Sequence, residues 1–524
     1  MRECPQEPGG KAAAPAILPR GRQAGIGMHF SSLPGPFGIG DIGDAAHAFV
    51  DTLAEMHLGV WQFLPTGPTA YGDSPYQPLS AFAGNEMLIG IEPLRRLGLL
   101  DAPDTEALTS LPAATVDYGR LIPLKHELLA GVAGRFNDRA GAGLRTAYQE
   151  FLHLHGAAWL DDYAAYRIIK TMHGEKPWPE WEPALVHREP AAMGRVLGQK
   201  SDAVEHIKVI QFLFDQQWRA LKDYAGERGV RLFGDMPIYI ALDSADAWAH
   251  PEILLIDGAG RPSRVAGVPP DYFSADGQLW GNPLYDWPFH ARQGYAWWIE
   301  RVRHAAECMD LVRIDHFRGF EAYWSIPFSA ETARTGEWLK GPADELFDAL
   351  DAALGHVPIV AEDLGVITPE VDELRHRHGI PGMCVLQFDV ADDDFSPDDI
   401  PENSVCYTGT HDNDTTVGWF QGGPGDTRTP EEIQKTRQNA LRLTGGGADT
   451  IHLDMIRLAL GTKAKLAVFP LQDLLGLDSG ARLNTPGTTS DNWRWRVRDE
   501  QLSPAVIETM TGMVEKAGRM PSRA

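Results

Sequence analysis

The chain has 524 residues, enough for one elaborated barrel or for about three average domains. Its hydrophobic content of 43% and charged content of 23% are ordinary for a globular enzyme. The formal net charge of -25 argues against nucleic acid or an anionic membrane as a partner and favours a neutral substrate.

Residues 1–22 are rich in Ala, Pro and Gly and lack the apolar segment of a signal peptide, so we expect a flexible N-terminal extension. No apolar run is long enough to predict a membrane span. The few cysteines include no CxxC pair, so the sequence predicts neither a disulfide framework nor a metal site. Together these features favour a cytoplasmic protein without a membrane partner. The cysteines are Cys4, Cys308, Cys384 and Cys406.

From residue 23 onwards, short apolar segments alternate with longer helical ones, for example the helices expected at 44–58 and 295–309. This alternation predicts βα units and a parallel sheet. The candidate strands lie at 24–30, 59–64, 230–235, 311–315, 358–362, 383–388, 405–408 and 465–472. Eight such strands favour an α/β fold of the (β/α)8 TIM barrel type, with the active site at the carboxyl ends of the strands. We therefore expect residues 23–524 to form a single catalytic barrel.

Two long segments interrupt the barrel pattern as insertions. Residues 86–226 have the periodicity of amphipathic helices, broken near Trp178. Residues 242–290 are rich in Pro, Gly and aromatic residues, which predicts a loop-rich subdomain. The loop at 65–85 is too long for a simple connection, so we expect it to have a function.

The strand at 311–315 carries charge on one face. Arg313 and Asp315 point to the same side, while Val312 and Ile314 point to the other and fit a surface packed against helices. Burying two charges on a parallel strand is costly unless they pair or serve a site. Arg313 can keep the carboxylate of Asp315 ionised, and Gly319 allows a sharp exit from the strand. The competing interpretation is a purely structural ion pair.

Four carboxylates stand at or just beyond the ends of predicted strands: Asp235, Asp315, Glu362 and Asp412. Each taken alone is typical of a solvated or capping acid. In a barrel, however, the carboxyl ends of all strands meet at one mouth, so the four are expected to converge there. His411 and Arg313 would join them.

Two chemistries use such a set of carboxylates. Retaining cleavage of a glycoside needs an ionised nucleophile and a protonated acid about 5 Å apart. Asp315 beside Arg313 suits the nucleophile, and Glu362, with apolar neighbours in the chain, suits the acid. The alternative is a Mg²⁺ site, but the arginine on the same strand face competes with a cation for the nearest carboxylate.

The chain closely resembles the 4-α-glucanotransferases called amylomaltases or disproportionating enzymes, within the α-amylase clan. The resemblance runs from about residue 24 to 496. It rests on the stretches 32–40 (SLPGPFGIG), 71–77 (YGDSPYQ), 80–85 (SAFAGN), 234–239 (GDMPIY), 267–273 (GVPPDYF), 279–282 (LWGN), 313–319 (RIDHFRG), 361–365 (AEDLG), 409–413 (GTHDN) and 484–487 (NTPG).

The resemblance implies transfer of α-1,4-glucan segments by retaining double displacement, without a metal or organic cofactor. It implies Asp315 as nucleophile, Glu362 as general acid and base, and Asp412 as the residue that holds the sugar hydroxyls. The substrates would be maltooligosaccharides, amylose, glycogen or starch. Residues 271–273 would belong to a mobile flap. Substrate-binding positions would be Ser74, Tyr76, Asp235, Trp280, Arg313, His411 and Asn484, and Tyr71 and Tyr118 would mark a possible second glucan groove.

Two other function classes stay open at this point. One is an α-1,4-glucan hydrolase, and the other is a non-catalytic glucan-binding protein. The second requires a lost carboxylate, whereas Asp315, Glu362 and Asp412 are all present. Product sizes from maltotriose distinguish the three classes, because they predict a ladder with glucose, simple shortening, or no reaction.

Overall fold

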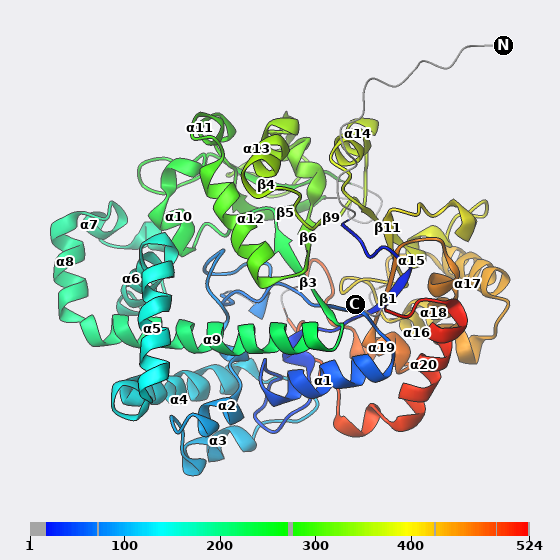
Figure 1. Ribbon diagram of the computed structural model, residues 1–524. Coiled ribbons are helices and arrows are strands. Elements are labelled where there is room, and N and C mark those ends of the chain that lie inside the picture. The colour runs from blue at the N-terminus through cyan, green and yellow to red at the C-terminus, as the bar shows by residue number, and fades with distance from the viewer. Residues whose placement is uncertain (1–16, 71–72, 271–275, 424–425, 489, 522–524) are drawn as a thin grey trace.

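The computed structural model describes residues 17–70, 73–270, 276–423, 426–488 and 490–521 (Figure 1). Eight parallel strands form its centre. They are β1 (Gln23–Gly27), β2 (Val60–Gln62), β3 (Arg231–Pro237), β6 (Leu311–Asp315), β9 (Ile359–Ala361), β10 (Gly382–Val385), β11 (Ser404–Tyr407) and β12 (Leu466–Pro470).

The strands surround one interior in the order β10-β11-β12-β1-β2-β3-β6-β9. The ring is nearly closed between β9 and β10, where the N–H of Ala361 donates to the carbonyl of Pro381 at 2.9 Å. The predicted (β/α)8 barrel is therefore confirmed. Several strands end one to three residues earlier than predicted. At β10 and β12 the reason is that the chain turns at once into the short helices α15 (Leu386–Asp389) and α19 (Leu471–Leu474).

Side chains alternate between the barrel interior and the helical layer. Leu311 belongs to the interior cluster, together with Val60 and Phe233 from neighbouring strands. Val312 and Ile314 pack on the outside among aromatic and aliphatic residues of the helices. The prediction for this strand is confirmed, since Arg313 and Asp315 share the inner face with Leu311.

Helices cover the outside of the barrel. α17 shows how the sequence delimits them: Thr429 and Glu432 form a reciprocal capping box at its start, and Gly445, at φ 64°, ends it. The covering helices are α1 (Asp44–Glu55), α9 (Ser201–Glu227), α12 (Ala296–Cys308), α13 (Asp344–Leu354), α14 (Pro369–Arg377), α16 (Thr416–Gln421), α17 (Pro430–Thr444), α18 (Ile451–Gly461) and α20 (Pro504–Ala517).

The segment between β2 and β3 is mainly helical, as the periodicity of residues 86–226 predicts, with a 3-10 turn at Trp178–Glu180. Figure 1 shows α4 to α8 on one side of the barrel and α16 to α20 on the other. These helices are α2 (Ile91–Arg96), α3 (Glu106–Thr109), α4 (Tyr118–Arg139), α5 (Ala142–His155), α6 (Asp161–Met172), α7 (Pro183–Val186) and α8 (Pro190–Gln199).

The second insertion differs from the prediction. Residues 242–290 were expected to be rich in loops, but besides the short helices α10 (Ala245–Ala249) and α11 (Trp287–Arg292) they contain two strands. These join two strands beyond β6 in an antiparallel sheet of order β5-β4-β7-β8. Strands of four to six residues are too short to show a clear hydrophobic alternation in the sequence. They are β4 (Arg264–Val268), β5 (Gln278–Pro283), β7 (Ala322–Pro327) and β8 (Glu337–Lys340).

The flexible extension was predicted to reach residue 22, but residues 17–22 pack against the barrel. Ile17 is 7% exposed and Leu18 is 3% exposed. Both join the interior cluster formed by the inward side chains of the strands. Because they precede β1 by only a few residues, they lie at the end where the parallel strands begin, opposite the carboxylates that the sequence predicts to be catalytic.

We expect Leu18→Ala to lower the free energy of unfolding by about 2 kcal/mol, because the change removes buried methyl groups and leaves a cavity. Transfer activity at 25 °C is expected to stay unchanged, since the site lies at the other end of the barrel. Urea unfolding followed by tryptophan fluorescence measures the effect, with Arg20→Ala at an exposed position as the control. Equal midpoints for the two variants would contradict this packing role.

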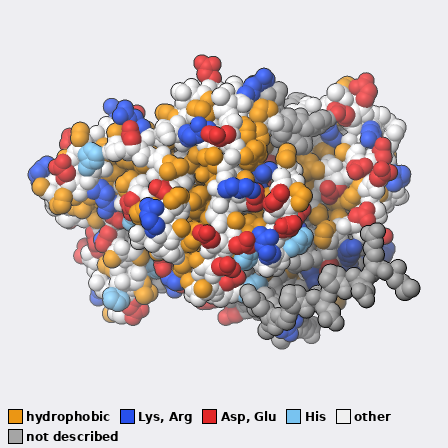
Figure 2. All heavy atoms as spheres, turned by 90° about the horizontal axis from the view of Figure 1, so that it is seen from above, with side chains coloured by type: hydrophobic (Ala, Val, Ile, Leu, Met, Phe, Trp, Pro, Cys, Tyr) orange, Lys and Arg blue, Asp and Glu red, His pale blue; other side chains and the backbone are white. Residues whose placement is uncertain are grey.

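The outer surface carries both signs of charge. Figure 2 shows acidic and basic side chains interspersed over the described part of the face seen from above. The excess of acidic residues is therefore not gathered into one patch on that face. None of the helices in the described ranges combines the length and the apolar character that crossing a membrane requires.

Candidate active site

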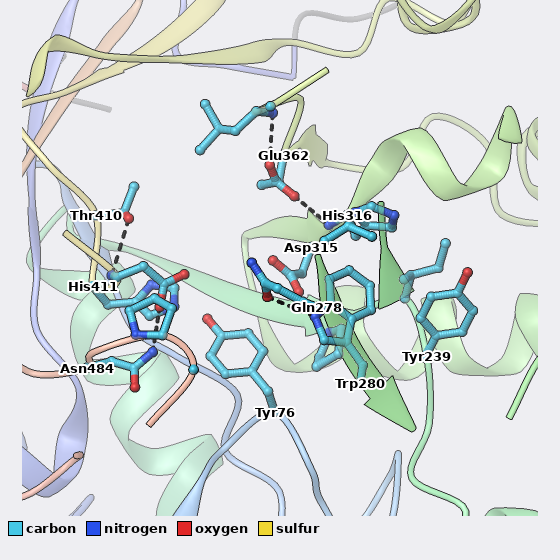
Figure 3. Close-up of a pocket in the computed structure, with 18 of the residues that line it drawn as sticks. Tyr76, Tyr239, Gln278, Trp280, Asp315, His316, Glu362, Thr410, His411 and Asn484 are labelled. Atoms are coloured by element: carbon cyan, nitrogen blue, oxygen red, sulfur yellow. Dashed lines mark hydrogen bonds and ion pairs between the residues drawn. The ribbon is translucent and has the colours of Figure 1, made fainter. Parts of the chain in front are cut away.

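A cleft of about 540 Å³ opens at the carboxyl ends of the barrel strands. In the close-up, Asp315 lies between Glu362 on one side and Tyr76 on the other (Figure 3). The structure brings together most of the predicted site residues in the walls of this cleft: Ser74, Tyr76, Trp280, Arg313, Asp315, Glu362, His411, Asp412 and Asn484.

Arg313 holds two carboxylates at once. The register of β3 and β6 places Asp235 beside Arg313, and Nη1 of the arginine lies 2.6 Å from Asp235 Oδ2. Nη2 lies 2.9 Å from Asp315 Oδ1. The side chain of Asp235 is 1% exposed, whereas that of Asp315 is 31% exposed. The structural interpretation thus fits the buried Asp235, and the catalytic role of the partly exposed Asp315 stays a prediction.

Asp235 does not line the cleft. Its Oδ2 accepts hydrogen bonds from Arg313 and, at 2.8 Å, from the hydroxyl of Tyr76. A direct contact between Asp235 and substrate stays a prediction. Asp235 lies behind the cleft and holds Arg313 and Tyr76, and the side chains of these two residues line the cleft.

Glu362 follows β9 directly and is held by two backbone donors. Its Oε2 accepts the N–H of His316 at 2.7 Å, and its Oε1 accepts the N–H of Leu364 at 2.8 Å. The first donor depends on His316 having φ 56°, a left-handed conformation that is uncommon outside glycine. The sharp exit from β6, predicted at Gly319, therefore occurs at His316. A Cβ at Gly319 would lie 2.9 Å from Ile238 Cδ1, so a larger residue there would require the Ile238 side chain to shift.

Burial and neighbouring charges separate the two carboxyl groups. Burial, followed by the charge of Asp315, raises the pKa of Glu362 to about 7. Burial also raises the pKa of Asp315, but the Arg313 guanidinium opposes that rise. Near neutral pH Glu362 can therefore still carry a proton, while the ion pair with Arg313 favours the ionised form of Asp315. This is the division that retaining glycoside cleavage needs.

A second polar group lies across the cleft from Glu362. Oδ1 of Asp412 accepts a hydrogen bond from Asn484 Nδ2 at 2.6 Å and lies 3.3 Å from His411 Nε2. The ring of His411 stacks on Tyr76, with centroids 5.2 Å apart and an interplanar angle of 14°. Segments after β2, β11 and β12 thus join in one wall.

Trp280 comes from β5 of the antiparallel sheet. Its Nε1 donates to Gln278 Oε1 at 3.0 Å, and its ring meets His316 edge to face, with centroids 4.8 Å apart. His316 therefore connects Trp280 to Glu362, a role that sequence reasoning missed. The sequence could not show this role, because a left-handed backbone conformation at a histidine leaves no recognisable pattern.

The family of the chain follows from its similarity to known proteins. The sequence model of a glycoside hydrolase family described as 4-alpha-glucanotransferase matches residues 28–502. This span includes all three catalytic carboxylates that the sequence predicts. The chain belongs to the 4-alpha-glucanotransferase family.

Individual relatives agree with this assignment. The 4-alpha-glucanotransferase of Thermus thermophilus is 44% identical over 506 residues, covering 95% of this chain and 99% of that protein. A chloroplastic or amyloplastic 4-alpha-glucanotransferase of Arabidopsis thaliana is 41% identical over 480 residues, covering 91% of this chain and 81% of that protein. The amylomaltase of Streptococcus agalactiae in complex with acarbose matches with a TM-score of 0.89 at 35% identity, covering 95% of this chain and all of that one.

The second glucan groove of this 4-alpha-glucanotransferase family member stays a prediction. Tyr71 lies outside the described residues, as do residues 271–273 of the expected flap. Tyr118 is 7% exposed, and its hydroxyl donates to the carbonyl of Trp493 at 2.9 Å. The tyrosine ring therefore offers little surface to a glucan in this arrangement.

The described parts of the chain offer no evident metal site. Within them, no three histidine, cysteine or acidic side chains come together in an arrangement that could hold a metal ion. Arg313 occupies the position between two of the four carboxylates. Metal-independent catalysis by this family member stays a prediction, and its test is given with the pH dependence below.

Proposed function

We propose that the chain is a 4-alpha-glucanotransferase that moves segments of α-1,4-glucan from a donor to an acceptor glucan or glucose, with Asp315 as nucleophile and Glu362 as acid and base. The observation that supports this assignment is that the two carboxyl groups have different surroundings, which favour an ionised Asp315 and a protonated Glu362. Arg313 stabilises the ionised form of Asp315. Burial raises the pKa of Glu362 to about 7, so this group can still carry a proton near neutral pH.

In the first step, a carboxylate oxygen of Asp315 attacks C1 of the donor glucose. The bond from C1 to the glycosidic oxygen breaks, and Glu362 gives its proton to that oxygen. The product is a β-glucosyl ester on Asp315 and a released glucan with a new 4-hydroxyl end. Arg313 keeps one oxygen of Asp315 occupied, so the other is available to attack.

In the second step, the 4-hydroxyl of an acceptor attacks the same C1. Glu362, now ionised, takes the hydroxyl proton, and the ester bond to Asp315 breaks with net retention of configuration. One glycosidic bond replaces another, so the free energy changes little and the competitor is water. The two backbone donors to Glu362 hold its carboxyl group in one place for both proton transfers.

Asp412 is proposed to hold the 2- and 3-hydroxyls of the reacting glucose, because its second oxygen is left free by Asn484 and His411. His411, Tyr76 and Ser74 would complete that subsite. Trp280 would stack on the acceptor sugar, a use for which its half-exposed ring is suited. We propose maltooligosaccharides, amylose, glycogen and starch as the glucans, and the cytoplasm as the location.

Sizing the products from maltotriose tests this function against its alternatives. A transferase gives glucose and a ladder of longer maltooligosaccharides, a hydrolase gives only shorter products, and a glucan-binding protein gives none. No feature of the cleft favours hydrolysis or passive binding specifically.

The transfer rate is expected to fall as pH rises through about 7, because Glu362 must be protonated in the first step and burial raises its pKa to about that value. On the acid side, activity is lost when Asp315 takes up a proton, and this limb is expected above the usual aspartate pKa because burial raises it. Initial rates on maltotriose between pH 4 and 9 measure both limbs.

The same rates measured with EDTA are expected to follow the same curve. Loss of activity with EDTA, restored by Mg²⁺ or Ca²⁺, would instead support the metal-dependent alternative.

Trp280→Ala is expected to raise the ratio of hydrolysis to transfer by roughly threefold to tenfold. Loss of the ring weakens acceptor binding by about 1 kcal/mol or more, while water keeps its access to the ester on Asp315. Reducing ends released from maltotriose, compared with glucose formed, give the ratio.

Leu279→Ala is the matched control, because Leu279 is the exposed neighbour on the other face of β5. An unchanged ratio in Trp280→Ala, even with a lower rate, would mean that this residue does not favour acceptor over water.

A further inference from the structure

A second, smaller chamber of about 60 Å³ lies inside the mouth of the barrel. It shares Arg313, Thr410 and His411 with the cleft, and it reaches inward to Met383 and Val468 of the interior cluster. The chamber therefore separates the packed core from the floor of the active site. Thr410 and His411 stand on the side of the cleft opposite Trp280 (Figure 3).

Among the described residues, three buried polar side chains of the chamber wall have an atom without a hydrogen-bond partner: His29, Ser32 and Tyr407. His29 is 8% exposed and Ser32 is 1% exposed. Across the described parts of the chain, nothing makes a hydrogen bond to His29 Nδ1 or to Ser32 Oγ. Buried polar atoms in native proteins nearly always have a hydrogen-bond partner, from protein or from ordered water. His29 and Ser32 line the same chamber, so one occupant can serve both.

The charged groups of the chamber wall are already engaged. Arg313 is bound by Asp235 and Asp315. Arg482 donates to the carbonyls of Asn484 at 2.8 Å and Asp412 at 2.7 Å.

Asp414, the acidic residue of the wall, accepts from the N–H of Thr415 at 2.8 Å and from the hydroxyl of Ser479 at 2.6 Å. Because each of these charged groups already has hydrogen-bond partners, the chamber suits a small neutral ligand that both donates and accepts hydrogen bonds.

Water fits this description. At a share of roughly 30 Å³ per molecule, the chamber has room for about two waters, each with polar partners on the wall. His29 is suited to bind them, because burial, followed by the charge of His411, lowers its pKa to about 3 and so keeps the ring neutral. A neutral imidazole donates from one nitrogen and accepts at the other.

We propose that this chamber binds two ordered water molecules, and that His29 acts through them as a positioning residue for His411. The proposal rests on the proposed role of His411 in holding the reacting glucose. One face of the His411 ring is covered by Tyr76, and Nε2 lies against Asp412. The second ring nitrogen is the atom that a chamber water would reach, and that bond would fix the ring's rotation.

A high-resolution crystal structure tests the ligand without reference to activity. We expect two waters in the chamber, within hydrogen-bond distance of His29 and Ser32. A dry chamber would overturn the proposal, and so would anomalous density there after a sodium bromide soak, because it would mean an anion site.

Kinetics on maltotriose test the positioning role. His29→Phe removes both ring nitrogens and is expected to lower kcat about tenfold while changing KM less than twofold, since a misplaced His411 costs mainly transition-state stabilisation. His29→Asn places an amide near the position of Nδ1 and is expected to recover most of the rate. Ser32→Ala, which changes little volume, is expected to lose one water and to lower kcat twofold to threefold.

Ser31→Ala is the matched control, because Ser31 is equally buried beside these residues but does not line the chamber. It is expected to leave kcat unchanged. A wild-type kcat in folded His29→Phe, or the same loss in His29→Asn as in His29→Phe, would contradict the positioning role. Because wild-type transfer is measured alongside, failure of the proposed function itself would be seen separately.

Discussion

Asp315→Asn is expected to abolish transfer, with kcat on maltotriose reduced by about 10⁴-fold or more. The change removes the nucleophile but little volume. The fold is expected to survive, because Arg313 keeps its buried partner Asp235 at 2.6 Å and the Asp315 side chain is partly exposed in the cleft. Initial rates and urea midpoints of the variant and of the wild type measure the two effects.

Asp310→Asn provides a matched control at the opposite end of the same strand. Oδ2 of Asp310 accepts the N–H of Leu232 at 2.8 Å, a bond that an asparagine oxygen can also accept. Transfer is expected to be normal in this variant. A near wild-type rate in Asp315→Asn would remove Asp315 from the mechanism.

The stereochemistry of a rescue reaction identifies the nucleophile directly. In Asp315→Gly, azide can occupy the space left by the carboxylate and displace fluoride from α-maltosyl fluoride. The expected product is β-maltosyl azide, because a single displacement inverts the configuration at C1. An α-configured azide from this variant would mean that another residue still forms the covalent intermediate.

Glu362→Ala is expected to lower the rate on maltotriose by roughly 10²–10⁴-fold, because no group then protonates the leaving oxygen. α-Maltosyl fluoride should still react with Asp315, since fluoride leaves without a proton. Added azide, which needs no base, would resolve the ester and give α-maltosyl azide.

The opposite configuration of the azides from the two variants is the sharpest check on the assigned roles. It rests on the geometry of retaining cleavage, in which the nucleophile and the acid act from opposite sides of the reacting carbon. β-Maltosyl azide from the Glu362 variant would reverse the assignment. The basic limb of the pH profile should also vanish with the fluoride donor, because the group whose pKa burial raises to about 7 is gone.

Much of this architecture follows from local pattern. Period-two alternation and apolar runs were sufficient to locate all eight barrel strands, and β6 has the predicted bounds of residues 311–315. The barrel geometry then places the ends of its strands at one mouth, whatever their separation in sequence. That is why Asp315, Glu362 and Asp412 could be grouped before any distance was known.

Other features depend on neighbours that the sequence does not specify. The register of β3 against β6 gives Arg313 a second carboxylate, Asp235. Where one ion pair was expected there are two, one with the buried Asp235 and one with the partly exposed Asp315, the proposed nucleophile. The short strands β4 and β5 become recognisable only through β7 and β8, which the chain adds after β6. β4 lies inside this sheet and β5 at its edge, and neither is long enough to show a clear alternation of apolar and polar residues.

The sequence by itself therefore determined the barrel, the order of its strands along the chain and the identity of the charged residues at its mouth, because those depend on residue type and spacing. Only the tertiary structure decided the left-handed turn at His316, the burial of Ile17 and Leu18, and the chamber behind His411. The physical reason is that backbone strain, burial and cavity shape are properties of packed neighbours from distant segments, and no local pattern encodes them.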